Sequence, residues 1–128
     1  MPISRKTTSA TAAELTIGGS MPSATSRVVI PANMALNIDI QVLAIEDGAA
    51  NCAKWDLECL VLNSGGTMSI AGPSGAQAPD RTLGSPGSWT VELKVDDTND
   101  SFVVEVVGEA ATNIHWRAIL RCAEAQYA

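Results

Sequence analysis

The sequence predicts an all-β protein, an antiparallel, jelly-roll-like β-sandwich of about seven or eight strands. The first observation is that apolar and polar residues alternate with a period of two over several runs of the chain. The second is that residues typical of turns, namely Gly, Pro, Ser, Asn and Asp, separate these runs. The third is that no segment keeps a helical stripe of apolar residues over three turns.

Length and composition favour one packed domain, because the chain has 128 residues, of which 46% are hydrophobic and 17% charged. We expect the sandwich to occupy residues 14–128. The polar residues 1–13 predict a flexible N-terminal arm. The stretch 72–87 is rich in Gly, Pro and Ser and predicts a long surface loop, a kind of segment that is often functional or mobile.

The predicted strands differ in strength. Alternation is clearest in the stretches 36–46, 52–64, 88–97, 101–108 and 113–124, and weaker in 14–19, 26–31 and 67–72. Three tryptophans fall on the inward parity of their strands, which predicts core positions and not an exposed sugar-binding platform: Trp55, Trp89 and Trp116.

The stretch 52–64 changes character along its length. Lys54, Asp56 and Glu58 make one face polar, and Leu60 and Leu62 then make the same face apolar. A strand end that is apolar on both faces predicts a second contact surface, because exposed apolar patches mark interaction sites.

The charge balance argues against a nucleic-acid partner. The formal net charge is −6, whereas phosphates demand a basic face. Residues 1–31 hold three basic side chains and one acidic, so this segment suits either an acidic partner surface or an ordinary solvated one. No run of about 18 apolar residues is present, so we expect no membrane span.

The three cysteines are expected to be reduced and packed as small hydrophobes. They form no C-x-x-C pair and no Cys/His cluster with the spacing of a zinc site. Free thiols suit assembly in a reducing cytosol. The start of the chain has no apolar core of a signal peptide. We expect no metal and no cofactor.

The acidic stretch Asp96–Asp100 has two interpretations. An EF-hand loop needs a glycine at its sixth position, where this chain has Ser101. A turn between two strands is the better interpretation, because Asp and Asn cap turns through their side chains and tolerate positive φ. A weak Ca²⁺ site at the tip of this turn stays open as the alternative.

Catalytic residues are hard to find. His115 is the single histidine, and it is expected on the outward face of its strand, two residues from Arg117. The chain contains no nucleophile motif with which it could act as a base. Asp56 and Glu58 share a strand face, as do Arg117 and Arg121, which fits cross-strand ion pairs better than a glycosidase pair. We therefore expect no enzyme, and a surface or subunit-interface role for His115.

The last third of the chain resembles a β-rich module of tail-fibre and other virion proteins of tailed bacteriophages. In that module a Trp-led strand leads to an Asp-Thr-x-Asn turn, a Val-rich strand ends in Gly, and a final strand reads Ile-x-Trp-x-Ala. The corresponding residues here are Trp89, Asp97–Asn99, Val106–Gly108 and Ile114–Ala118. The order of strands upstream is also similar, so that the resemblance covers about residues 26–121. Asp100 stands where the module usually has Gly.

The resemblance implies a phage virion structural protein, located in the virion after assembly in the host cytoplasm. Without a fibre shaft, the module is most similar to a capsid decoration (cement) protein, a class that is commonly homotrimeric. The expected partners are then other copies of the chain and the major capsid protein. Arg5 and Lys6 are the candidate capsid contacts, and Leu60, Leu62 and Ile119 the candidate trimer interface.

The alternative is a receptor- or glycan-binding module of a tail fibre or head fibre, with the loop 72–87 as its contact. The same fold serves both roles, so the residues alone leave the two open.

Overall fold

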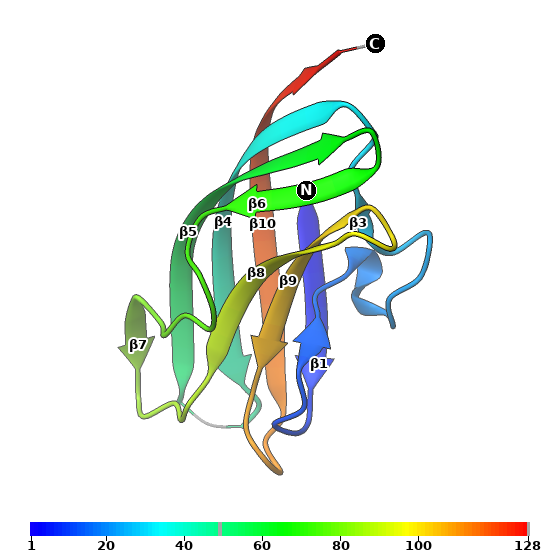
Figure 1. Ribbon diagram of the computed structural model, residues 1–128. Helices are drawn as coiled ribbons and strands as arrows, with labels where there is room; N and C mark the ends of the chain where they lie inside the picture. Colours follow the sequence, from blue (N-terminus) through cyan, green and yellow to red (C-terminus); the bar gives the residue numbers. More distant parts are fainter. Residues whose placement is uncertain (49, 128) are drawn as a thin grey trace.

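The computed structural model describes residues 1–48 and 50–127, and in them two antiparallel β-sheets pack face to face (Figure 1). The predicted all-β sandwich is therefore confirmed. Among the described residues no helix is long and apolar enough to span a bilayer.

The larger sheet has the three longest strands at its centre, each of 13 residues, where the alternation is clearest in the sequence. Its strand order corresponds to a Greek key, the unit from which jelly rolls are built, because β4, β5 and β6 follow one another and β10 returns beside β4. The order is β1 (Pro2–Thr7), β10 (Ile114–Gln126), β4 (Met34–Glu46), β5 (Cys52–Ser64) and β6 (Thr67–Ala71), with β7 (Arg81–Leu83) also paired to β5.

The smaller sheet covers the lower part of the larger one in the view of Figure 1. Its main pair is the hairpin of β8 (Thr90–Asp96) and β9 (Ser101–Val107). Two short strands, β2 (Ala13–Glu14) and β3 (Val28–Val29), pair with the other edge of β9. A 3₁₀ turn, η1 (Ile17–Gly19), lies between them in the sequence.

The core between the sheets contains all three tryptophans. Trp55, Trp89 and Trp116 are each at most 2% exposed, and the ring centroid of Trp116 lies 5.5 Å from that of Trp55 and 6.2 Å from that of Trp89. Aromatic pairs at such separations add to the free energy of burial. The core positions predicted for the three tryptophans are thus confirmed.

The expected flexible arm is wrong for residues 2–7, which form the edge strand β1. They pair residue by residue with β10, from Pro2 opposite Ile119 to Thr7 opposite Ile114. The physical reason is burial, since the side chain of Ile3 is 1% exposed inside the core. The backbone of Ser4 also exchanges two hydrogen bonds with that of Thr16, of 2.9 and 3.1 Å, on the other side.

The strand β10 continues beyond β1. Met1 and Leu120 exchange the last backbone hydrogen bonds of the β1–β10 pair, both 3.0 Å long. From residue 121 to 126, β10 pairs with β4 on one edge, and no strand of the described residues pairs with its other edge. The side chains of these residues are exposed on both faces because the smaller sheet does not cover them.

The stretch 72–87 lies on the surface but is held against the sandwich in its middle. Gln77 exchanges backbone hydrogen bonds of 2.8 and 3.2 Å with Val91 of β8. The backbone N–H of Asp80 donates to the carbonyl of Lys54 at 2.8 Å, and β7 then pairs with β5. The segment lies on the surface as predicted, but it contains the short strand β7 and is anchored to the sandwich.

Candidate assembly surface

The outer face of the larger sheet, the face that points away from the smaller sheet, carries an unusual number of exposed apolar side chains. Antiparallel partners share a face, so the register places each outward residue in a row across the strands. Six large apolar side chains with exposed fractions between 39% and 70% lie on this face: Leu43, Ile45, Leu60, Leu62, Leu83 and Ile119.

The predicted interface residues share the outer face but do not form one cluster. Leu60 and Leu62 are outward neighbours on β5. Ile119 lies two strands away on β10, opposite Gln41, whereas Leu60 lies opposite Asn37. Polar residues of β4 therefore separate Ile119 from the two leucines.

A second apolar group on the outer face escaped the sequence analysis. Leu43 and Ile45 lie at the lower end of β4, and the register places Ile45 in one row with Cys52 and Leu83. A groove of about 460 Å³ runs beside Leu43 between β4 and β7. The sequence contains a sign of this apolar group, because Leu43 and Ile45 occupy alternate positions that hold polar residues earlier in the same strand.

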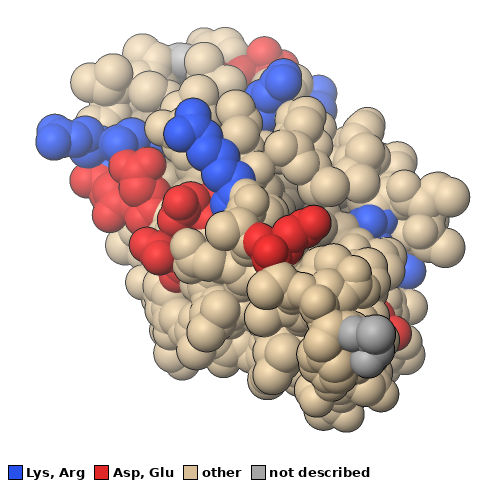
Figure 2. Space-filling view, turned by 90° about the horizontal axis from the view of Figure 1, so that it is seen from above, with Lys and Arg blue, Asp and Glu red and all other residues tan. Residues whose placement is uncertain are grey.

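Charged side chains on this face are partly segregated by strand. Outward positions of β10 hold His115, Arg117 and Arg121 and no carboxylate, whereas outward positions of β5 hold Asp56 and Glu58 together with Lys54. Arg81 of β7 lies opposite Lys54. Seen from the end that carries the β5–β6 turn, charges of both signs gather on one half of the visible surface and the other half is largely uncharged (Figure 2).

The predicted cross-strand ion pairs are wrong for these residues. Asp56 instead pairs along its own strand with Lys54, and His115 Nε2 lies 4.0 Å from a carboxylate oxygen of Asp47. Arg117, Arg121 and Glu58 have no ionic partner in the part of the chain that the structure describes. Long side chains on an open face gain little from pairing in water, which explains why they stay apart.

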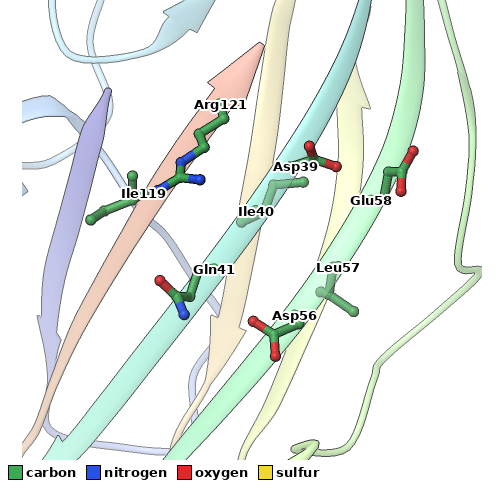
Figure 3. Close-up of a pocket in the computed structure, with 8 residues that line it drawn as sticks. All are labelled: Asp39, Ile40, Gln41, Asp56, Leu57, Glu58, Ile119 and Arg121. Carbon is green, nitrogen blue, oxygen red and sulfur yellow. The ribbon is translucent and has the colours of Figure 1, made fainter.

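A shallow, open groove of about 420 Å³ crosses the middle of the outer face (Figure 3). Three neighbouring strands line it, and their carboxylates, amide and guanidinium do not converge on a common point. The outward side chains along it are Asp39 and Gln41 of β4, Asp56 and Glu58 of β5, and Ile119 and Arg121 of β10. The described residues contain no group of three His, Cys, Asp or Glu side chains that would hold a metal ion.

Arg5 and Lys6, the predicted capsid contacts, point to opposite sides of β1. Lys6 lies on the outer face opposite His115. Arg5 has the inward parity at the sheet edge, where its Nη1 donates to the carbonyl of Glu14 at 3.2 Å. Residues of consecutive number in a strand face opposite ways, so the two side chains lie on different faces of β1, and their capsid contact stays a prediction.

The acidic stretch Asp96–Asp100 forms the β8–β9 turn, as predicted. The carboxylate of Asp96 accepts hydrogen bonds from the backbone N–H of Thr98 and from the backbone and side chain of Asn99, at 2.6 to 3.2 Å. These hydrogen bonds hold the pKa of Asp96 below its usual range, and the bond from the Asn99 side chain contributes most. Asp100 has φ of 50°, in the left-handed region that glycine adopts most readily.

Comparison with known proteins adds one distant likeness. No family model and no curated protein matches the chain. Among solved structures, the chain is similar to the tailspike protein of an Acinetobacter phage, with 14% sequence identity and a TM-score of 0.45. The match covers 99% of this chain and 22% of the tailspike chain, so that the chain spans less than a quarter of the tailspike's length.

Proposed function

We propose that this chain is a structural protein of a tailed-phage virion, which assembles as a homotrimer and decorates the capsid. The observation that carries the proposal is the outer face, where six of the exposed large apolar side chains gather on one side of one sheet. Exposed apolar groups such as Leu43 with Ile45 and Leu60 with Leu62 mark interaction sites. The sequence resemblance over residues 26–121 supplies the virion context.

The activity of such a protein is mechanical. A trimer that spans neighbouring capsid subunits buries apolar area across their seams. Any partner that binds only the assembled shell raises the free energy needed to pull its subunits apart.

The first test is the native mass by light scattering after size exclusion, with and without EDTA. We expect the mass of three chains in both conditions. Leu43→Glu should give monomers, because it places a charge in the apolar group of the outer face. Met21→Glu is the matched control, since Met21 is 72% exposed but lies outside the larger sheet. A wild-type monomer would overturn the trimer.

Capsid binding is tested separately by co-sedimentation with capsids. Removal of residues 1–13 is unsuitable because it deletes β1 from the sheet. Lys6→Glu reverses one exposed charge and leaves the backbone pairing intact. We expect weaker binding than that of the wild type, and equal binding would remove Lys6 from the capsid contact. Arg5, which bonds to Glu14, is expected to matter less.

The alternative, a receptor- or glycan-binding module, is favoured by the groove of Figure 3, whose carboxylate, amide and guanidinium groups suit sugar hydroxyls. A monomer that binds defined glycans on an array would support it over the trimer. We assign no reaction to the chain. His115→Ala should therefore leave glycan binding unchanged, and a loss of binding would reopen the role of this histidine.

A further inference from the structure

On the outer face, the outward cations of β10 form a basic flank, and the two outward carboxylates of β5, Asp56 and Glu58, form an acidic flank. Along β10 the outward side chains between residues 115 and 121 include Arg117 and Arg121 and no carboxylate. Along β5 they include Glu58 and Asp56, and the single cation there, Lys54, already pairs with Asp56. A second cation on this side, Arg81 of β7, lies opposite Lys54 and away from Glu58. The guanidinium groups of β10 and the carboxylates of β5 thus lie on opposite sides of the central strand β4.

Two of these charges lie at the same level along the strands. The register places Arg121 opposite Asp39, and Asp39 opposite Glu58, so the three form one row across the sheet. Figure 3 shows the side chains of Arg121 and Glu58 on either side of β4 with no contact between them. Both side chains are exposed, and neither forms an ion pair within the described chain.

The strand between the flanks is suited to lie near a symmetry axis. Its outward side chains at the lower end are Leu43 and Ile45, which are 56% and 53% exposed. Asn37 and Gln41 above them are uncharged, and the one carboxylate, Asp39, has Arg121 beside it in the same row. Identical apolar residues pack well across an axis, whereas like charges would repel.

A rotation axis parallel to the strands keeps each residue at its own height. If the axis runs along β4, the basic flank of one copy faces the acidic flank of the next, which is a head-to-tail contact that closes into a ring. The row that holds Arg121 then meets the row that holds Glu58. Each unpaired charge obtains a partner of the opposite sign as it leaves water, and a buried charge requires such a partner.

We infer that copies of this chain associate through the outer face of the larger sheet, with β10 of one copy against β5 of the next and Arg121 paired with Glu58 of the neighbouring copy. This inference rests on the proposed trimer and identifies its interface. Leu43 and Ile45 form the apolar centre of the contact, and the groove of Figure 3 is covered in the assembly.

The test is a charge swap followed by analytical ultracentrifugation. Glu58→Arg and Arg121→Glu should each weaken association at least about tenfold, because each places like charges in contact. The double variant restores opposite charges and should associate within about threefold of the wild type, since coupled charges do not act additively. Circular dichroism checks that each variant is folded, as expected for exposed positions.

Glu124→Arg is the matched control. It makes the same change of charge on an exposed residue of β10 whose parity is inward, and it should leave association unchanged. If the wild type is a trimer and neither charge reversal weakens its association, the interface is wrong while the proposed function stands. The same holds if the double variant associates as weakly as the single variants. A wild-type protein that is monomeric would contradict both the interface and the proposed trimer. If the wild type is a dimer and its association responds to the charge swap as expected, the interface is supported and the trimer is contradicted.

Discussion

Trp116 Nε1 donates a buried hydrogen bond of 2.9 Å to Oγ1 of Thr7, across 109 residues of sequence. This contact joins the first strand of the chain to the last and places a polar anchor inside the core. It also explains why the polar N-terminal segment is ordered, because Thr7 satisfies an indole N–H that would otherwise be buried without an acceptor.

Thr7→Val should therefore destabilise the fold. The substitution keeps the shape of the side chain but leaves the indole N–H of Trp116 unsatisfied, at a cost of about 1–3 kcal/mol. The neighbouring Thr8 is exposed, so Thr8→Val is a matched control with little expected effect. Chemical denaturation measures both free energies of unfolding. Equal midpoints for the two variants would show that the bond contributes nothing.

Two glycines separate the effect of backbone conformation from that of close packing in the segment 72–87. Gly75 and Gly84 have φ of 78° and 76°. A Cβ at Gly75 would meet nothing within 4 Å, whereas at Gly84 it would lie 2.3 Å from Asn51 Oδ1 and 2.6 Å from the carbonyl oxygen of Ala50.

Gly84→Ala should thus destabilise the protein more than Gly75→Ala does. Both variants incur the left-handed penalty of about 1–2 kcal/mol, and the contact with Asn51 and Ala50 is an additional cost only at Gly84. Thermal unfolding of the two variants gives the comparison. Similar melting temperatures would mean that the segment around Gly84 is not held against Asn51.

The Asp96 turn predicts a pH dependence of stability. The pKa of Asp96 is lowered in the folded chain, first by the Asn99 side chain, so the ionised carboxylate stabilises the fold. This contribution is complete above the unfolded pKa of about 3.9 and disappears as the pH falls through the lower folded value.

We expect Asp96→Asn to cost about 0.5–1 kcal/mol near neutral pH, a small value because the site is partly exposed. The difference from the wild type should shrink below the unfolded pKa. Urea midpoints from pH 2 to 7 test this, with Glu124→Gln as a control that removes an exposed carboxylate outside any turn. A difference that does not change with pH would contradict the assigned hydrogen bonds.

The cysteines should differ in reactivity. Cys59 is 3% exposed, and burial, with smaller contributions from Cys122 and Glu58, raises its pKa to about 11. Cys122 is exposed. Since the thiolate is the reactive form, iodoacetamide at pH 8 should modify Cys122 first and reach Cys59 only on unfolding. Mass spectrometry of peptides follows both sites, and early labelling of Cys59 would show that the core opens readily.

The parts of the fold that alternation could predict are the long strands. In β4 and β5 the period of two is sustained over enough residues to fix which side chains enter the core. The strand β1 was missed because its one large apolar side chain, Ile3, gives no visible alternation, and its order comes from contacts with β10.

The candidate surface was predictable only in part. Parity alone placed Leu60, Leu62 and Ile119 on outward faces, but the distance between them depends on the register of β10 against β4. Register follows from pairing between segments far apart in sequence. The opposite directions of Arg5 and Lys6 would have followed from alternation, once residues 2–7 are known to be a strand.

The unpaired edge of β10 has a practical consequence for anyone who expresses this protein. Residues attached ahead of Met1 continue the path of β1, so an affinity tag there would run past Arg121 and Cys122 with its backbone free to add to the sheet. An apolar linker would dock and mask the edge, whereas a linker with proline would leave it bare and prone to pair with other molecules. We therefore expect the sequence of such a tag to influence whether copies of the protein pair along this edge.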